Sequence, residues 1–175
     1  MNDLLIRIDK QNKVIGFETK EKCHYCPGIL HRAFSIFIFN AKNELLLQKR
    51  SSKKLLWPEV WSNSCCSHPK NDEDLILTAS KRLNEELGFS CKLKYLGSLY
   101  YQANFKNFGC EHEITHIYSG KYEGIVKPNS DEVIQTKWIK LDDLQKEITE
   151  NPESFTPWLK LILKKYGKNN FFSSG

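Results

Sequence analysis

Short apolar runs broken by polar turns dominate the first third of the chain. Leu4 to Ile8 and Val14 to Phe17 are β-favourable runs separated by a polar turn, a pattern typical of a hairpin. A second pair, Ala33 to Phe39 and Glu44 to Gln48, flanks Asn40 to Asn43, where asparagine supplies turn chemistry. We therefore predict two strand pairs in this part of the chain.

The pattern becomes helical from Asp72 to Leu87. Apolar residues recur there at helical spacing on one face: Leu75, Ile76, Ala79, Leu83 and Leu87. Asn71 or Asp72 is predicted to cap the start of this helix, because short polar side chains accept hydrogen bonds from its first amides. Gly88 stands where a left-handed residue commonly ends a helix.

Strands return after this helix, and helices close the chain. Leu93 to Gln102, Glu111 to Tyr122 and Glu132 to Ile139 are predicted strands, and Leu141 to Thr149 is a predicted helix. Pro152 to Tyr166 is a second predicted helix, opened by a proline in its first turn. Strands on both sides of a central helix indicate an α+β fold with a mixed sheet.

Length and composition predict one globular domain. The 175 residues contain 40% hydrophobic and 27% charged residues, close to the averages of globular proteins. The chain has no internal repeat and no Pro/Gly/Ser-rich linker. We expect a single domain over residues 1–167 and a frayed tail over residues 168–175.

Charge and cysteine content narrow the classes of partner. The 26 basic and 21 acidic residues give a net charge of +5, which suits an anionic small molecule. No dense basic block indicates nucleic-acid binding, and no apolar run is long enough for a membrane span or a signal peptide. The six cysteines are expected to be reduced thiols, since we expect a cytoplasmic protein.

The segment Glu111-His112-Glu113 carries the first candidate chemistry. Strand alternation places Glu111 and Glu113 on one face and His112 on the other. Two adjacent carboxylates repel each other unless a cation lies between them. The segment is therefore either a metal-binding pair or a solvated strand face.

Histidines elsewhere favour the metal site. His24, His31 and His68 could join the two carboxylates in an N/O site of octahedral type for a divalent ion. His112 and His116 alternate away from the carboxylate pair and are expected to take no part.

A structural zinc site is the competing hypothesis. It would use Cys23, Cys26, Cys65 and His68. Because Cys65 and Cys66 are adjacent, their side chains diverge if the segment is extended, which weakens this hypothesis.

An aromatic segment and scattered cations complete the candidates. Trp57-Pro58-Glu59-Val60-Trp61 leads towards Cys66 and could form a pocket wall or part of the core. Four basic residues could converge on phosphate groups or remain solvated: Lys20, Arg50, Lys54 and Arg82.

Several strings of the sequence together resemble one family, the type 1 isopentenyl-diphosphate Δ-isomerases of the Nudix fold. The similarity is collinear from about Leu5 to Leu161. It includes His24 and these strings: Leu30-His31-Arg32-Ala33-Phe34-Ser35, Trp57-Pro58-Glu59-Val60-Trp61-Ser62-Asn63-Ser64-Cys65-Cys66-Ser67-His68-Pro69, Glu111-His112-Glu113 and Phe155-Thr156-Pro157-Trp158. The tryptophan-rich string is specific to these isomerases.

A degenerate Nudix box runs from Ser67 to Phe89. Ser67 replaces its first glycine, Lys81 its arginine and Arg82 the following glutamate. The isomerases are similar in departing from the box there, which favours an isomerase over a Nudix pyrophosphohydrolase. Glu85 and Glu86 support the hydrolase as the alternative.

The resemblance implies a fold, an activity and a site. The fold is a Nudix-type mixed β-sheet flanked by helices, with a short N-terminal β extension, and the expected oligomeric state is a monomer or weak dimer. The activity is the interconversion of isopentenyl and dimethylallyl diphosphate, in isoprenoid biosynthesis, through a carbocation-like intermediate.

The residue roles follow from the same resemblance. Cys66 is the expected catalytic thiol, Glu113 its acid/base partner and Tyr101 a hydrogen-bonding residue, while Trp158 would lie against the hydrocarbon. One divalent ion (Mn²⁺, Mg²⁺ or Zn²⁺) would be bound by His24, His31, His68, Glu111 and Glu113. Glu86 would help to hold a Mg²⁺ that is bound with the diphosphate. Lys20, Arg50, Lys54 and Arg82 would form a cationic clamp.

Overall fold

A nine-stranded mixed sheet forms the centre of the protein. The computed structural model describes residues 4–69 and 74–172. Its elements follow the chain in the order β1 (Leu4–Ile8), β2 (Val14–Thr19), α1 (Lys20–His24), β3 (His31–Phe39), β4 (Glu44–Arg50), β5 (Trp61–Ser62), β6 (Cys65–Ser67), α2 (Leu75–Leu87), β7 (Leu93–Phe105), β8 (Gly109–Lys121), β9 (Val133–Lys140), α3 (Leu141–Glu150), a 3₁₀ turn (Pro152–Ser154) and α4 (Pro157–Phe172). The α+β prediction is confirmed.

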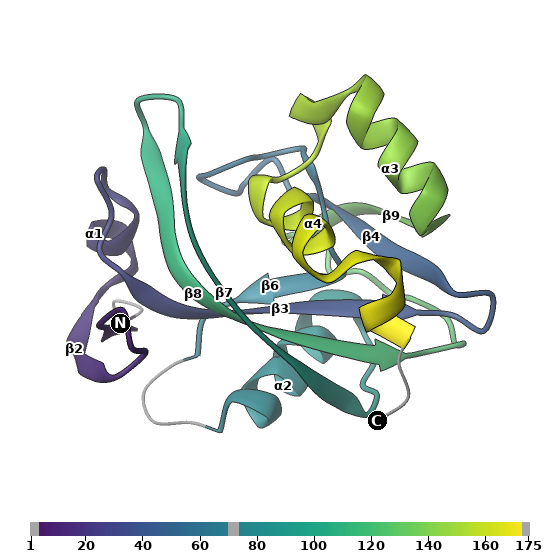
Figure 1. Ribbon diagram of the computed structural model, residues 1–175, viewed down its shortest axis with the longest axis horizontal. Helices are drawn as coiled ribbons and strands as arrows, with labels where there is room; N and C mark the ends of the chain where they lie inside the picture. The colour runs from purple at the N-terminus through teal and green to yellow at the C-terminus, as the bar shows by residue number, and fades with distance from the viewer. Residues whose placement is uncertain (1–3, 70–73, 173–175) are drawn as a thin grey trace.

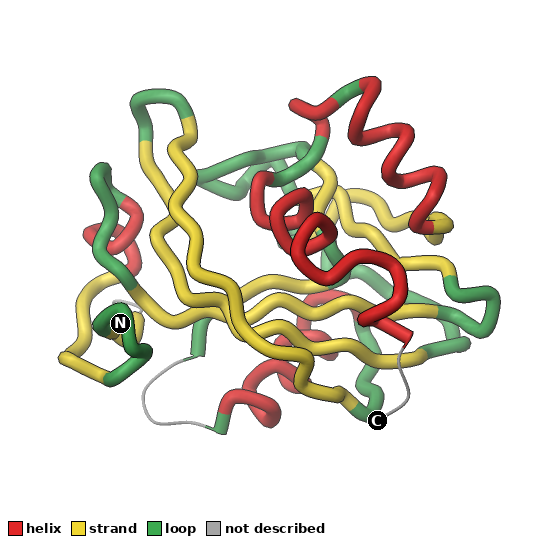
Figure 2. The backbone as a smooth tube through the Cα atoms, in the orientation of Figure 1, coloured by secondary structure: helices red, strands yellow, loops and turns green. Residues whose placement is uncertain are grey.

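Strand β3 organises the sheet. It pairs in parallel with β8 along its whole length and antiparallel with β6, and it also pairs with β1 and β4. Strands β7 and β8 form one long antiparallel hairpin (Figure 2). The hairpin of β1 and β2 joins the sheet through β3, so it forms the N-terminal β extension that the resemblance implies.

Two apolar layers cover the sheet, because β3 alternates its side chains between them. Phe34, Ile36 and Ile38 pack in the cluster that includes Leu83 of α2. The residues between them, such as Phe37, pack in the other cluster with α3 and α4. Figure 1 shows α2 on one side of the sheet and α3 and α4 on the other. Burial on both faces explains why β3 is an almost continuous apolar run.

Helix α2 begins later than predicted. Its N-cap is Asp74, whose carboxylate accepts hydrogen bonds from the amides of Ile76 and Leu77. The predicted caps, Asn71 and Asp72, lie outside the described residues and before the observed cap, so that assignment was wrong. Gly88 ends the helix with φ 76°, as expected.

The last predicted helix is interrupted. Pro152–Ser154 forms a 3₁₀ turn, and α4 begins only at Pro157. Between them Phe155 forms a bridge with Trp61, and the amide of Thr156 donates to the Trp61 carbonyl at 2.9 Å. These contacts hold the segment extended, so one continuous helix cannot form.

The chain remains helical beyond the predicted domain boundary at residue 167. Helix α4 changes direction at Gly167, where φ is 60°, and continues to Phe172. Phe171 is buried, and its ring lies 4.9 Å from Phe37 and 5.5 Å from Phe39. The frayed tail over residues 168–175 stays a prediction; the helix continues to Phe172, and residues 173–175 lie outside the described chain.

No helix in the described parts of the chain is long and apolar enough to cross a membrane.

His116 on β8 should remain uncharged in mildly acidic solution. Burial, assisted by the charge of Arg32, lowers its pKa from 6.5 to about 4, and its Nε2 lies 3.1 Å from the Asn12 amide. The unfolded chain binds this proton at a higher pH than the folded protein does. Protonation of the unfolded chain therefore lowers the free energy of unfolding as the pH falls from 6.5 towards 4, and this loss is absent above pH 6.5. We expect His116→Gln to remove about 1–2 kcal/mol of the acid-dependent loss in unfolding free energy. Urea unfolding at pH 7 and pH 4.5 measures this difference; equal losses in both proteins would contradict it.

Candidate active site and metal centre

The three predicted histidines and two glutamates lie together at one end of the sheet. The parallel register of β3 and β8 places His31 beside Glu113. Helix α1 supplies His24, and His68 follows directly after β6. The ligand atoms of the cluster all lie within 4.8 Å of one another: His24, His31, His68, Glu111 and Glu113.

The contacts within the cluster run between imidazole nitrogens and carboxylate oxygens. His24 Nε2 lies 2.9 Å from Glu111 Oε2. Glu113 Oε1 lies 2.9 Å from His68 Nε2 and 3.4 Å from His31 Nε2. His112 and His116 take no part, as predicted: His112 contacts Tyr100 and the Gly28 carbonyl on the other face of β8.

Backbone carbonyls orient two of the imidazoles. His24 Nδ1 lies 2.7 Å from the Lys20 carbonyl, and His31 Nδ1 lies 2.7 Å from the Ile29 carbonyl. A carbonyl only accepts, so each Nδ1 donates to it and each Nε2 faces the cluster. Metal-binding histidines commonly have this arrangement.

The cluster fits a divalent metal ion. His31 Nε2 and Glu111 Oε2 are buried with no hydrogen bond of good geometry, and their close polar neighbours in the described residues are within the cluster, at 3.4 Å (Glu113 Oε1) and 2.9 Å (His24 Nε2). Burial and then the neighbouring His31 and His24 hold the pKa of His68 well below its usual value, which leaves its nitrogen free to bind a metal. An ion bound by these nitrogen and oxygen atoms would satisfy the orphaned groups.

Tyr101 connects this cluster to the adjoining cavity. Its hydroxyl donates to Glu113 Oε2 at 2.6 Å, so the two oxygens of Glu113 serve different partners. Burial and the neighbouring carboxylate raise the pKa of Tyr101 well above 10. Burial alone would raise the pKa of Glu113, but its contact with His31 and the hydrogen bond from Tyr101 hold it below its usual value. Glu113 is therefore a buried carboxylate next to a neutral phenol.

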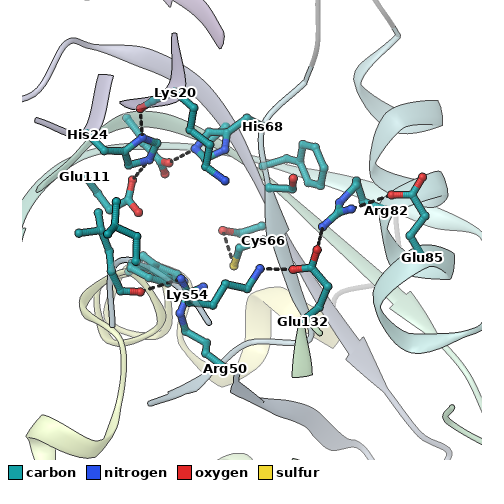
Figure 3. A pocket seen from close by; sticks show the side chains of 18 of the residues that line it. Lys20, His24, Arg50, Lys54, Cys66, His68, Arg82, Glu85, Glu111 and Glu132 are labelled. Atoms are coloured by element: carbon teal, nitrogen blue, oxygen red, sulfur yellow. Dashed lines mark hydrogen bonds and ion pairs between the residues drawn. The ribbon is translucent and has the colours of Figure 1, made fainter. Parts of the chain in front are cut away.

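Cys66 lies in the cavity between the metal cluster and a group of cations (Figure 3). Its thiol donates to Asn63 Oδ1 at 3.0 Å and lies 3.6 Å from Ser35 Oγ. Burial raises the pKa of Cys66 to about 11, so the sulfur is a neutral thiol near pH 7. Cys65, the next residue in β6, packs instead in the core beside α2.

This divergence contradicts the structural zinc hypothesis. The thiol of Cys65 lies near Glu86 on the α2 side of the sheet, while His68 faces the other histidines. In the described residues, the metal-suited cluster contains no cysteine. None of the six cysteines forms a disulfide in this structure.

The four predicted cations line one cavity of about 560 Å³ together with Cys66. Lys20 lies near the histidines, and Lys54, Arg50 and Arg82 lie around the opposite side (Figure 3). Arg50 donates to the carbonyls of Leu56 and Trp57 at 2.9 Å each. The cavity therefore offers an anionic group several positive charges beside the thiol.

Glu86 occupies a different place from the His/Glu cluster. It is 1% exposed, and its carboxylate accepts from Arg82 at 2.7 Å and from Gln48 at 3.2 Å. Arg82 also donates to Glu85 at 2.7 Å. Glu85 and Glu86 of the degenerate Nudix box thus both contact Arg82, the arginine that replaces the glutamate following the box arginine.

Trp158 forms an aromatic wall of the cavity. It is 3% exposed, and its indole nitrogen donates to Ser62 Oγ at 3.0 Å. Trp57 packs edge-on against it at 5.3 Å between ring centroids, and the Arg50 guanidinium lies 5.3 Å from the Trp158 ring centre. Trp158 lines the cavity, whereas Trp57 packs behind it in the core, so the segment from Trp57 to Trp61 belongs to the core and not to the lining.

Sequence reasoning missed residues whose roles depend on tertiary contacts. Asn63 and Ser35 surround the thiol, and Glu132 connects Lys54 with Arg82. Asn63 stands inside the aromatic-to-cysteine string, so its position gave one signal. Ser35 ends the string that begins at Leu30, which is a similar signal, whereas Glu132 has no motif of its own in the sequence.

Comparison with known proteins agrees with this geometry. The NUDIX domain family matches residues 29–159. Isopentenyl-diphosphate Delta-isomerase from Serratia proteamaculans is 41% identical over 97% of this chain and 94% of its own length. The protein of the same name from Burkholderia multivorans is 39% identical over 95% of this chain and 94% of its own.

Solved structures support the fold. A crystal structure of a Deinococcus radiodurans protein has a TM-score of 0.76 at 16% identity and covers 93% of this chain and 99% of its own. The MutT protein from Methanosarcina mazei has a TM-score of 0.66 at 19% identity and covers 81% of this chain and 95% of its own. The NUDIX match and the close relatives together place this chain in the isopentenyl-diphosphate Delta-isomerase family of NUDIX-domain proteins.

Proposed function

We propose that the protein interconverts isopentenyl diphosphate and dimethylallyl diphosphate in isoprenoid biosynthesis. The observation that carries this proposal is the position of Cys66 in one cavity with the Glu113–Tyr101 pair, the cations and Trp158. Nearly full-length relatives with this name support the same reaction.

The reaction needs two proton transfers and no net gain or loss of protons. A proton is added at one end of the double bond, and another is removed from the carbon on its far side. The Cys66 thiol and the Glu113–Tyr101 pair are the two proton-carrying groups in this part of the cavity. One group donates a proton to the terminal carbon of the double bond, and the other accepts a different proton from the carbon on its far side, so the two groups together are suited to general acid–base catalysis.

The buried aromatic wall would protect a carbocation-like intermediate. Water would trap such an intermediate as an alcohol, so the hydrocarbon end must remain dry. Trp158, supported from the core by Trp57, provides a desolvated surface, and an indole face attracts positive charge. Tyr101, whose ring centre lies 6.4 Å from that of Trp158, extends this wall to Glu113.

The cations would bind the diphosphate away from the reacting carbons. Lys20, Arg50, Lys54 and Arg82 line the cavity, and binding energy from this end orients the hydrocarbon. We assign Glu86 to the Mg²⁺ that accompanies the diphosphate.

A divalent ion (Mn²⁺, Mg²⁺ or Zn²⁺) would be held by the cluster of His24, His31, His68, Glu111 and Glu113. When bound, it would supply positive charge that fixes the Glu113 carboxylate and favours its deprotonated form. Glu113 would keep its second oxygen on Tyr101.

We also propose the cytoplasm as the compartment, since a reaction that depends on the Cys66 thiol needs reducing conditions.

Cys66→Ala tests the catalytic assignment. Without the thiol, we expect kcat to fall by about a thousandfold, the usual scale for removal of a general acid or base. Turnover of isopentenyl diphosphate is followed by the methyl signals of the product in NMR spectra.

Cys65→Ala is the matched control, because this neighbouring thiol lies on the α2 side of the sheet. It should retain turnover at some cost in stability. Near-normal turnover by folded Cys66→Ala protein would contradict the thiol mechanism.

Metal binding should stabilise the wild-type fold through the His/Glu cluster. An ion at a hundred times its Kd adds about 2.7 kcal/mol to the free energy of unfolding. His31→Gln removes one buried ligand, so we expect the metal-dependent rise in Tm to disappear and the bound metal to fall. His112→Gln, on the opposite face of β8, should retain both. Equal metal content and equal Tm shifts in the two variants would refute this site.

A further inference from the structure

Glu132 joins two cations that come from opposite walls of the cavity. One carboxylate oxygen pairs with Lys54 Nζ, and the other lies 3.3 Å from Arg82 Nη2. Lys54 belongs to the loop after β4, whereas Arg82 belongs to α2. Figure 3 shows Glu132 between the two, with Cys66 beside them. The carboxylate is therefore a bridge across this side of the cavity.

The backbone of Glu132 is fixed to both walls. Its carbonyl accepts from the Ser51 amide at 3.0 Å, and the Ser51 carbonyl accepts from the Lys54 amide at 3.1 Å. The Glu132 amide donates to the Asn129 carbonyl at 2.9 Å, and the Asn129 amide donates to the Glu86 carbonyl at 2.9 Å. A short chain of hydrogen bonds thus connects Glu132 with the Lys54 loop and with α2.

The preceding residue forms a natural comparison. Asp131 pairs with Lys53, but these side chains are 70% and 69% exposed. Glu132 and Lys54 are 26% and 25% exposed. An exposed ion pair contributes little order, whereas a half-buried bridge restricts both side chains. The two adjacent pairs therefore have the same chemistry in different environments.

Glu132 has the same charge sign as a diphosphate, so it cannot attract that group. Its contribution is to restrict the motion of the cationic side chains that it contacts. A lysine side chain has about 2 kcal/mol of rotamer entropy, and a ligand that must immobilise a free lysine loses this from its affinity. Glu132 already holds Lys54 against the cavity and is one of three carboxylates around Arg82.

We propose that Glu132 is a positioning residue that holds Lys54 and Arg82 at the separation needed to bind the substrate's diphosphate. This inference rests on the proposed function for the identity of the substrate. It adds an acidic residue to a binding site whose other members are cations.

Glu132→Gln tests this role, because it keeps the shape of the side chain and the backbone bonds but removes the charge. We expect KM for isopentenyl diphosphate to rise about tenfold, because binding must then supply most of the rotamer entropy of the Lys54 side chain. We expect kcat to change less than about twofold. The Kd of inorganic diphosphate with Mg²⁺, measured by calorimetry, should rise by a similar factor. Asp131→Asn should leave all three values unchanged.

A double-mutant cycle with Lys54→Ala separates positioning from a general loss of fold. If Glu132 acts through Lys54, Glu132→Gln should raise KM less than about threefold when Lys54 is already absent. A full tenfold effect in that background would overturn the proposal, as would an unchanged or lower KM in the single variant. A fall in kcat with an unchanged KM in Glu132→Gln would also overturn the proposal.

Inorganic diphosphate binding distinguishes failure of this inference from failure of the proposed function. Absence of isomerisation by the wild-type protein would remove the proposed substrate, but the calorimetric comparison would still test whether Glu132 orders an anion site. An identical diphosphate Kd in wild-type protein and Glu132→Gln would refute the inference even if isomerisation is normal.

Discussion

Three imidazoles and two carboxylates buried at one point are the constraint on which the rest of the site depends. The parallel pairing of β3 and β8 places His31 beside Glu113, and α1 and the end of β6 add His24 and His68. Burial of these polar atoms without partners would cost free energy, and a bound cation removes that cost. The same arrangement fixes Glu113, whose other oxygen holds Tyr101 beside the cavity. Metal affinity and positioning of the proton-carrying groups therefore have one structural origin.

The cavity combines two chemical environments. Trp158 gives it a buried aromatic surface, and Lys54 and Arg82, which both contact Glu132, provide charge. The thiol of Cys66 lines the same cavity. A substrate with an apolar end and a diphosphate end matches this combination, because each end finds the environment that lowers its free energy.

Most of the fold and the five residues of the His/Glu cluster could be predicted from the sequence, but few of the contacts that support them could. Alternation in β8 correctly placed Glu111 and Glu113 on one face, and helical spacing located α2. Local patterns could not foresee the extended Phe155, because its conformation depends on the distant Trp61. They also gave no sign of the contact between Phe171 and β3. Glu132 was missed for the same reason, since its partners lie in other elements.

Deuterium incorporation tests the central claim of proton-transfer isomerisation most directly. The metal-loaded protein is incubated with isopentenyl diphosphate and Mg²⁺ in D₂O and followed by NMR. The account predicts new dimethylallyl methyl signals, with deuterium in the product and no release of phosphate. An unchanged substrate in a folded, metal-replete sample, or phosphate release without new methyl signals, would contradict it.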